Sequence, residues 1–483
     1  MSRICIVRHY YYPEDPRSRR EAEALAAAGH EVDILTLRHP DEPVREVING
    51  VNVRRLPVEH YRGSLPKYAY EYGAFFFLAF MVLTARLFRR RYDVVQVNSL
   101  PDFLVFAALA YKLAGVPVVI DMHECTPELF CTKYGASPSH PIVRLLAWIE
   151  QRSLAFADQV ITCTPQQRAL FASRGTPEDK IAVVLNAANS AIFRPRTPEP
   201  ITWQPGEQFE LVAHGLIAER YGLDTMVRAV ALLANDIPGV RLHVYGKGDY
   251  QPELEALVQE LGVTDRVLIH GFVPEEELLE GIAHAHVGVI AAKRDTFRDM
   301  THTQKMYEYV AMHKPVVIAE TPAVRTHFDD SCFQFFTSND PADLARALRE
   351  LYHRPERALT MIASASGRYR AYDWDAQRHV YSEAVLNAGT KRVLRPAVTP
   401  QPQIRVNASK MPSVAVGGNS ALASMDWSGM VAAMDDRDVY TPAVAMEATP
   451  ALASIDWGGM VAAIEDRELY ISGKATPNED GSI

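Results

Sequence analysis

The sequence predicts an α/β protein with two tandem, doubly wound domains that face each other across a cleft, followed by a largely disordered tail. Short apolar runs alternate with helical periodicity from residue 3 onward, a proline-spaced segment interrupts the alternation near residue 200, and it resumes to about residue 388. Strands that alternate with helices favour parallel sheets covered on both faces. Two such Rossmann-like domains in tandem place a ligand cleft where the carboxyl ends of their strands meet.

The first domain is predicted over residues 1–194. Its strand-like runs are 4–7, 32–37, 51–56, 94–97, 116–120, 160–162 and 181–185, and its helical patterns include 18–28, 102–114 and 141–157. Four prolines then mark residues 195–208 as a linker between domains.

The second domain is predicted over residues 209–372, where the alternation returns. Its strand-like runs are 209–213, 241–245, 267–269, 287–290, 316–318 and 332–335. We expect a last helix, 373–389, to return to the first domain.

Composition sets the broad class. The chain has 483 residues, of which 48% are hydrophobic and 23% charged, as in an ordinary globular protein of two or three domains. Five scattered cysteines indicate reduced cytosolic thiols, and Cys125 and Cys131 lack the second pair or histidine cluster that a metal site needs. For that reason we expect no bound metal. The first strand begins near Met1 without a signal-peptide pattern, so we expect a cytoplasmic protein. No nucleic-acid-binding motif is present, so nucleic acid is not an expected partner.

The tail, residues 390–483, is predicted to be flexible, because residues 390–420 are basic, proline-spotted and poor in large apolar groups. Residues 421–440 recur as 451–470 with fourteen of twenty positions identical, and 421–483 has eleven acidic against three basic residues, a net charge of −8. One helix face in the two copies would carry Trp427, Met430, Val431 and Met434, and Trp457, Met460, Val461 and Ile464. We expect both copies to dock on a separate protein with a basic groove; the alternative is that they fold back onto the chain's own surface.

A short helix with one carboxylate, followed by a strand, is predicted over residues 304–317. Thr301 and Gln304 have the spacing of a capping box, so we expect the helix to begin there. A loop before a helix start suits a diphosphate, and Glu308 lies where a carboxylate would accept hydrogen bonds from both hydroxyls of a ribose.

This stretch resembles the donor-nucleotide helix of retaining glycosyltransferase family 4, whose members have the GT-B fold, and the resemblance covers roughly residues 3–388. The family usually carries two glutamates seven residues apart; Glu308 matches the second, whereas the first falls on Met300, beside Asp299. The resemblance implies a nucleotide-diphosphate-sugar donor, UDP- or GDP-linked, with Lys305 and Glu308 among the donor-binding residues and no cofactor.

Other segments carry the same resemblance. Residues 212–224 are similar to the first strand–loop–helix of the nucleotide domain, with Gly215 in the loop. Tyr221 occupies the position where the family usually has a lysine, so Arg220 is the candidate cation for the diphosphate. The alternative is that Arg220 is a solvated arginine. Gly246 and Gly248 resemble the family's Gly-x-Gly turn, and Gly271 the strand end near the nucleobase.

The first domain would supply the opposite wall. His123 follows the strand-like run 116–120, where the family places a histidine that contacts the donor sugar; the alternative is a structural histidine. Arg17, Arg19 and Arg20 could bind a phosphate of the acceptor, but we favour a solvated helix start.

Residues 72–91 form an apolar, aromatic stretch that ends in arginines. The apolar part, 72–85, is too short by sequence to span a bilayer. It is predicted either to lie on an anionic membrane surface, which would make the protein peripheral to the inner face of the membrane, or to be a core helix with a solvated end.

The family resemblance implies a retaining glycosyltransferase, of the hexosyltransferase class, that serves polysaccharide biosynthesis. It would move a sugar to a glycan or a lipid-linked acceptor, with His123, Arg220 and Glu308 as catalytic residues. In such enzymes an oxygen of the β-phosphate is thought to take the acceptor proton. Two alternatives stay open: a nucleotide-sugar epimerase of the same fold, and a catalytically degraded scaffold that recruits partners through its tail.

Overall fold

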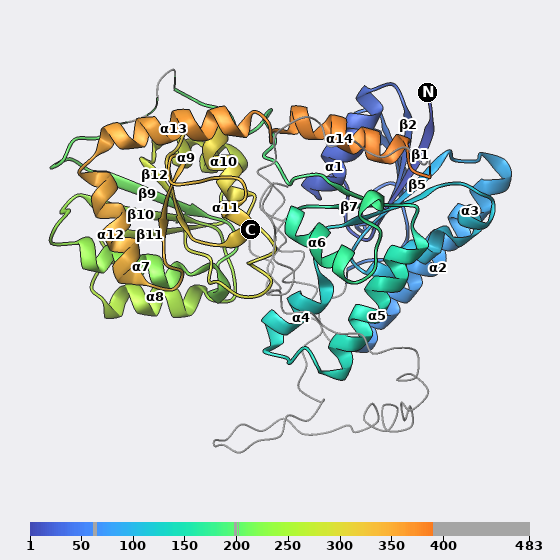
Figure 1. The fold of residues 1–483 in the computed structure, drawn as a ribbon, viewed down its shortest axis with the longest axis horizontal. Coiled ribbons are helices and arrows are strands. Elements are labelled where there is room, and N and C mark those ends of the chain that lie inside the picture. The colour runs from blue at the N-terminus through green and yellow to red at the C-terminus, as the bar shows by residue number, and fades with distance from the viewer. Residues whose placement is uncertain (61–64, 198–199, 201, 390–483) are drawn as a thin grey trace, which may run out of the picture.

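The computed structural model describes residues 1–389 except 61–64, 198, 199 and 201. Two α/β domains lie side by side, the first in blue to green and the second in green to orange (Figure 1). This arrangement confirms the predicted fold class. The duplicated motifs, 421–440 and 451–470, lie outside the described residues.

The first domain is built on an eight-stranded sheet of order β3-β4-β2-β1-β5-β6-β7-β8. Its neighbouring strands pair in parallel except β3 and β4. The strands are β1 (Arg3–Arg8), β2 (Glu31–Thr36), β3 (Arg45–Ile48), β4 (Val51–Arg55), β5 (Val94–Asn98), β6 (Val118–Met122), β7 (Gln159–Thr162) and β8 (Ile181–Val183).

The β3–β4 hairpin is an element that the sequence prediction missed. Asn49 and Gly50 form its two-residue turn, with φ of 47° and 82°. Positive φ at both positions is what the twist of a two-residue hairpin requires, and Asn-Gly is its preferred sequence. The strand was overlooked because β3 is largely exposed and has no apolar run.

The helices of the first domain cover both faces of this sheet. They are α1 (Pro16–Ala27), α2 (Leu65–Arg89), η1 (Asp102–Ala108), α3 (Leu109–Leu113), α4 (Thr126–Tyr134), α5 (Pro141–Phe156), α6 (Pro165–Ser173) and η2 (Glu178–Lys180). Apolar side chains of α2, η1, α5 and α6 pack on one face, and those of α1 pack on the other. Because the central strands are buried on both faces, they read as continuous apolar runs.

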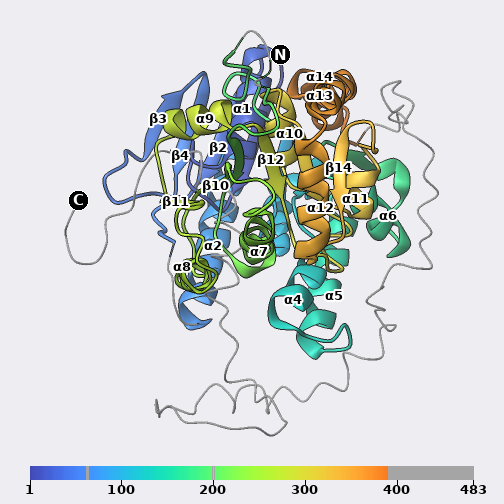
Figure 2. The ribbon, with the colours of Figure 1, turned by 90° about the vertical axis from the view of Figure 1, so that its left-hand side faces the viewer.

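The second domain has a six-stranded sheet of order β11-β10-β9-β12-β13-β14, parallel throughout. Its strands are β9 (Phe209–His214), β10 (Val240–Tyr245), β11 (Val267–Gly271), β12 (Val287–Ile290), β13 (Val316–Ala319) and β14 (Phe333–Phe336). Its helices are η3 (Glu219–Tyr221), α7 (Leu223–Leu233), α8 (Gln251–Glu260), α9 (Glu275–His284), α10 (Lys305–Ala311), α11 (Pro322–Arg325), α12 (Pro341–Tyr352) and α13 (Pro355–Tyr369). Helices α7, α8 and α12 cover one face of the sheet and α9 and α10 the other (Figure 2), and α13 contributes apolar side chains to the clusters on both faces.

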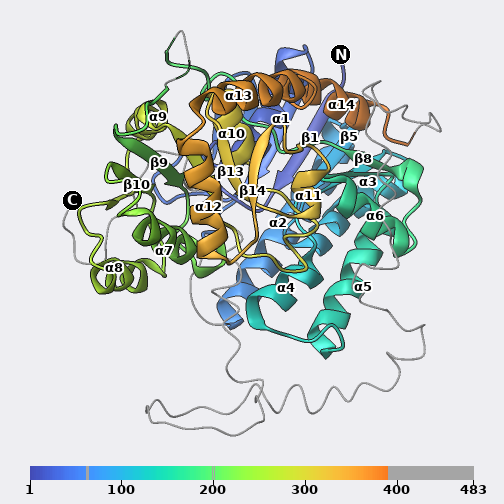
Figure 3. The same cartoon turned by 60° about the vertical axis from the view of Figure 1, so that its left-hand side comes forward.

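The last described helix, α14 (Trp374–Leu386), crosses from the second domain to the first (Figure 3). It packs in the same apolar cluster as α1, and the Tyr381 hydroxyl donates to Gln96 Oε1 of β5 at 2.8 Å. The two domains are therefore joined twice, by the linker before β9 and by α14.

Helix α2 is longer than the apolar stretch that the sequence suggested. Within it, Tyr70–Arg89 is long and apolar enough to cross a membrane by length and composition alone, so the expectation that this stretch is too short is wrong on length. Its inner face belongs to the core of the first domain, where Phe75, Ala79 and Leu83 are fully buried.

Candidate active site

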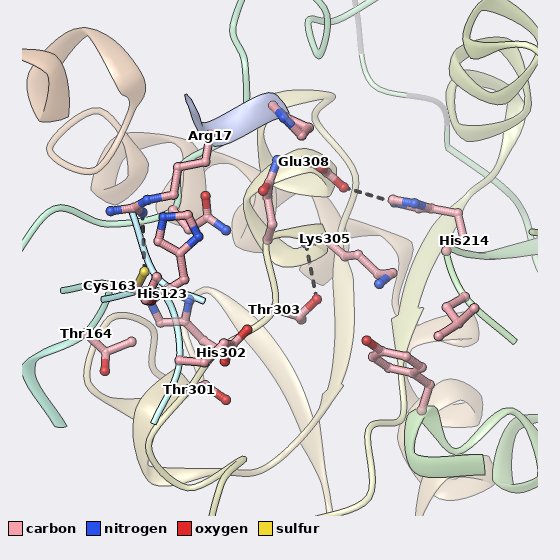
Figure 4. Close-up of a pocket in the computed structure, with 18 of the residues that line it drawn as sticks. Arg17, His123, Cys163, Thr164, His214, Thr301, His302, Thr303, Lys305 and Glu308 are labelled. Carbon is pink, nitrogen blue, oxygen red and sulfur yellow. Dashed lines mark hydrogen bonds and ion pairs between the residues drawn. The ribbon is translucent and has the colours of Figure 1, made fainter. Parts of the chain in front are cut away.

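A cavity of about 100 Å³ lies between the two domains, where the carboxyl ends of strands from both sheets meet (Figure 4). The first domain contributes Arg8 at the end of β1, Arg17 of α1 and His123 after β6. The second domain contributes His214 at the end of β9, the segment 301–305, and Glu308 of α10.

Helix α10 presents Glu308 to this cavity, but it does not begin with a capping box. The helix starts at Lys305, and its N-cap residue Gln304 makes no side-chain cap hydrogen bond. The Thr301 hydroxyl instead donates to the Phe297 carbonyl at 3.0 Å, and the Gln304 amide donates to Glu308 Oε1 at 3.0 Å. The predicted capping box is therefore wrong, and Gln304 serves to hold the carboxylate.

The Glu308 carboxyl is 4% exposed and has an unusual acidity. Burial raises its pKa to about 7, although Lys305 and the Gln304 hydrogen bond oppose the rise. His214 Nε2 lies 3.3 Å from Glu308 Oε2. Burial and Lys305 hold the pKa of His214 well below its usual value, so this histidine is neutral.

Three cations surround the ring of Tyr221, which itself lines the cavity. Lys305 Nζ lies 4.8 Å from the ring centroid, and the guanidinium carbons of Arg298 and Arg220 lie 5.0 and 5.2 Å from it. Such distances are those of cation–π contacts. Tyr221, at the position where the family usually has a lysine, thus carries no charge itself but makes cation–π contacts with Lys305, Arg298 and Arg220.

Glycines shape the floor beside Lys305. At Gly215, with φ of 108°, a Cβ would lie 2.5 Å from Lys305 Cε, so a side chain there would displace the end of Lys305. At Gly246, with φ of 143°, a Cβ would lie 1.9 Å from the Gly215 carbonyl oxygen. These two residues therefore let the loops after β9 and β10 pack backbone to backbone below the cavity.

The wall from the first domain is a buried hydrogen-bonded chain. Arg17 donates to both oxygens of Asp121 at 2.8 and 2.9 Å, and His123 Nε2 lies 2.9 Å from Asp121 Oδ2. Burial alone would raise the pKa of Asp121, but Arg17 and His123 hold it well below its usual value. Burial lowers the pKa of His123. The wall thus presents a neutral imidazole whose orientation Asp121 sets.

Arg17 and Arg20 of α1 are not solvated, contrary to the reading we favoured, whereas Arg19 is partly exposed. Arg17 and Arg20 are 3% and 6% exposed. Arg17 is paired with Asp121, and Arg20 donates to the Asn186 side chain and to the Ala187 carbonyl. Their charge holds the first domain together at the cleft edge.

Met300 stands where the family usually has its first glutamate, and it faces away from the cavity. Its side chain is 3% exposed and belongs to the apolar core of the first domain, and its carbonyl accepts from Thr164 Oγ1 at 2.6 Å. Asp299 is paired with Arg294 at 2.7 Å and does not line the cavity. The following residues, Thr301, His302 and Thr303, line it instead.

The structure brings four of the predicted site residues to one cavity: His123, Gly215, Lys305 and Glu308. The other four, Arg220, Gly246, Gly248 and Gly271, are not among the residues that line it. Sequence reasoning missed His214 and Thr303. His214 had a signal, since it is a polar residue at the carboxyl end of a buried strand; Thr303 had none, because its loop has no regular pattern.

Comparisons with known proteins match both domains. Residues 15–187 match the family described as glycosyl transferase 4-like domain, and residues 208–354 match glycosyl transferases group 1. A D-inositol 3-phosphate glycosyltransferase of Thermomonospora curvata is 28% identical over 382 residues, 74% of this chain and 86% of the relative. An uncharacterized glycosyltransferase of Methanocaldococcus jannaschii is 27% identical over 319 residues, 62% of this chain and 74% of the relative.

Solved structures share the fold. Sucrose-phosphate synthase of Thermosynechococcus elongatus aligns with a TM-score of 0.59 at 20% identity, covering 79% of this chain and 98% of that one. HepE of Anabaena in complex with UDP-glucose aligns with a TM-score of 0.59 at 15% identity, covering 80% of this chain and 100% of that one. From these matches to both domains and from the two facing sheets, the chain belongs to glycosyltransferase family 4 and has the GT-B fold.

Proposed function

We propose that this glycosyltransferase moves a sugar, with retention of its anomeric configuration, from a nucleotide-diphosphate-sugar to a hydroxyl of a glycan or a lipid-linked acceptor. The observation that carries the proposal is the pairing of Glu308 and Lys305 one helical turn apart, opposite His123. A carboxylate, a cation and a neutral imidazole around one cavity match the ribose, the diphosphate and the sugar of such a donor.

On the donor side, Glu308 accepts hydrogen bonds from the two ribose hydroxyls. Lys305 reaches the diphosphate through the space that Gly215 leaves, and Tyr221 keeps its ammonium in place. Positive charge beside the diphosphate stabilises the negative charge that develops on the leaving group. The UDP and UDP-glucose found with HepE of Anabaena favour a UDP-linked donor over a GDP-linked one.

The transfer step exchanges one bond at the anomeric carbon. The bond from that carbon to the β-phosphate oxygen breaks, the bond to the acceptor oxygen forms on the same face, and the acceptor proton passes to a phosphate oxygen. The chain itself positions the groups: His123, fixed by Asp121, donates to or accepts from the sugar hydroxyls and stays neutral through the reaction.

The test is turnover with a panel of UDP- and GDP-sugars and simple glycoside acceptors, with the product's anomeric configuration read by NMR. A retained anomer is expected, and Glu308→Ala should lose most donor binding, by about 2–3 kcal/mol. An inverted anomer contradicts retention. Conversion of the donor to an isomeric nucleotide-sugar without any acceptor would make the protein an epimerase. Calorimetry that finds no binding of any nucleotide-sugar would make it a scaffold.

A further inference from the structure

The outer face of α2 carries a straight row of exposed apolar side chains. Tyr70, Phe77, Met81 and Phe88 are 66%, 64%, 64% and 83% exposed. At 3.6 residues per turn these positions lie within about 40° of one another around the helix, and they extend over about 27 Å. Neighbouring α3 adds Leu113, which is 80% exposed. We call these residues the α2 face.

The carboxyl end of the α2 face is basic. Arg89, Arg90 and Arg91 are exposed. Arg90 pairs with Glu31, and the Arg91 guanidinium donates to the Ala114 carbonyl at 3.0 Å, just after α3. Arg89 makes no ion pair with any residue in the part of the chain that the structure describes. An apolar row that ends in cations suits an apolar, acidic occupant.

The described chain ends beside this basic end. A Cβ at Gly389 would lie 3.2 Å from Pro117 Cβ, and Pro117 is three residues beyond Ala114, whose carbonyl holds Arg91. Three residues span at most about 11 Å. The 94 residues that follow Gly389 therefore start next to the arginines of the α2 face.

The chain beyond Gly389 has the matching chemistry. Residues 421–483 have a net charge of −8, and each motif copy has a tryptophan and three apolar residues at helical spacing with acids directly after them. As a coil, the 31 residues 390–420 span about 30 Å, close to the length of the α2 face.

We propose that the duplicated motif, residues 421–440 or 451–470, docks on the α2 face of its own chain, with its apolar side on Phe77, Met81 and Phe88 and its acids toward Arg89–Arg91. The short connection makes the binding intramolecular, which raises the effective concentration of the motif at the face. Two copies double the chance of occupancy without requiring both to bind. A membrane surface is the competing occupant, but only the tail both begins at this face and carries the opposite charge.

The experiment places a photoreactive side chain on the face in the full-length protein. Phe77→p-benzoylphenylalanine should, on irradiation, cross-link to 421–440 or 451–470, as read by mass spectrometry of the peptides. Leu232→p-benzoylphenylalanine is the matched control, because Leu232 is 52% exposed on α7 of the other domain and should give no tail cross-link. Irradiating a mixture of isotopically labelled and unlabelled protein separates cross-links within one chain from those between chains.

Second changes test the chemistry. Trp427→Ala together with Trp457→Ala should lower the Phe77 cross-link at least tenfold, while either change alone should lower it about twofold. Arg89→Glu with Arg91→Glu should lower it too, and Arg144→Glu with Arg152→Glu on α5 should not. Trp427 and Trp457 lie beyond the described residues, so changing them leaves the side chains of α2 as they are.

Three outcomes would overturn the proposal. One is equal cross-linking from Phe77 and Leu232, and another is cross-links that join only differently labelled chains. The third combines two results: Phe77 gives no cross-link in solution, and the protein sediments equally well with phosphatidylglycerol vesicles whether or not Trp427 and Trp457 are replaced. That result would identify the α2 face as a membrane-binding surface.

Discussion

The acidity of Glu308 makes donor binding depend on pH. With a pKa of about 7 in the empty site, the carboxyl is largely protonated at pH 5.5 and largely charged at pH 8. Only the charged form accepts two hydrogen bonds from the ribose, so donor binding must release a proton below pH 7. Donor affinity should therefore fall by up to tenfold for each pH unit below 7, about 30-fold at pH 5.5.

The variant that isolates this effect is Glu308→Gln, which keeps the size of the side chain. It should weaken donor binding at pH 8 by about 2–3 kcal/mol, roughly 30- to 150-fold, and remove the pH dependence. The neighbouring His214 does not titrate over this range, because burial and Lys305 hold its pKa well below its usual value.

Isothermal titration with an intact nucleotide-sugar is the assay, since its diphosphate has no ionisation near neutral pH. Measurement in two buffers of different ionisation enthalpy counts the protons released. Wild-type affinity that is the same at pH 5.5 and pH 8, or a Glu308→Gln variant with the wild-type pH slope, would refute the reasoning. The effect of pH on folding has the opposite sign to its effect on donor binding. Because the pKa of Glu308 is raised in the folded state, the free energy of unfolding should fall by about 3 kcal/mol as the pH rises from about 4.5 to 7.

The remaining predictions concern the frame of the site. Asp121→Asn should destabilise the protein by about 3–5 kcal/mol in chemical denaturation, because it removes one of the two carboxylates, Asp121 and Glu21, that pair with the buried Arg17. Glu350→Gln in an exposed pair should change stability by less than about 1 kcal/mol. Gly246→Ala should abolish donor binding, because a Cβ there would lie 1.9 Å from the Gly215 carbonyl oxygen. Gly262→Ala, also at positive φ but in open space, should lower the stability of the fold by only about 1–2 kcal/mol. A Gly246→Ala variant that binds the nucleotide-sugar with unchanged affinity in calorimetry would disprove the loop packing. Met300→Glu, which restores the family's residue, should lower the melting temperature instead of raising activity, because the new carboxylate would be buried in an apolar core; a more active and equally stable variant would contradict this.

The elements that could be predicted from sequence are those whose signal is local. Buried parallel strands such as β5 and β6 read as unbroken apolar runs, and Asp15, whose side chain accepts from the backbone N–H of Arg17 and Ser18, marks the start of α1. The β3–β4 hairpin had a local signal as well, Asn49-Gly50, but its exposed strand lacked the apolar pattern that would have drawn attention to it.

The site was harder to predict because its partners are distant in sequence. Arg17 looked solvated because Asp121, 104 residues away, is brought to it only by the order of the strands. Thr301 looked like a helix cap because its competing acceptor, the Phe297 carbonyl, belongs to a loop whose turn has no sequence signature. Glu308 and Lys305 were predictable because one helix turn holds both and a family motif marks them.

The position of Met300 also bears on how the two domains move. The loop that leads into α10 is part of the second domain, yet it inserts Met300 into the apolar core of the first and bonds to Thr164, while Gln166 donates to Thr326 across the same boundary at 2.5 Å. Pulling the domains straight apart would expose that methionine and break the Thr164 bond, at a cost of about 2–4 kcal/mol. Any opening of the cleft that keeps this contact intact would therefore have to be a rotation of one domain against the other, and not a straight separation.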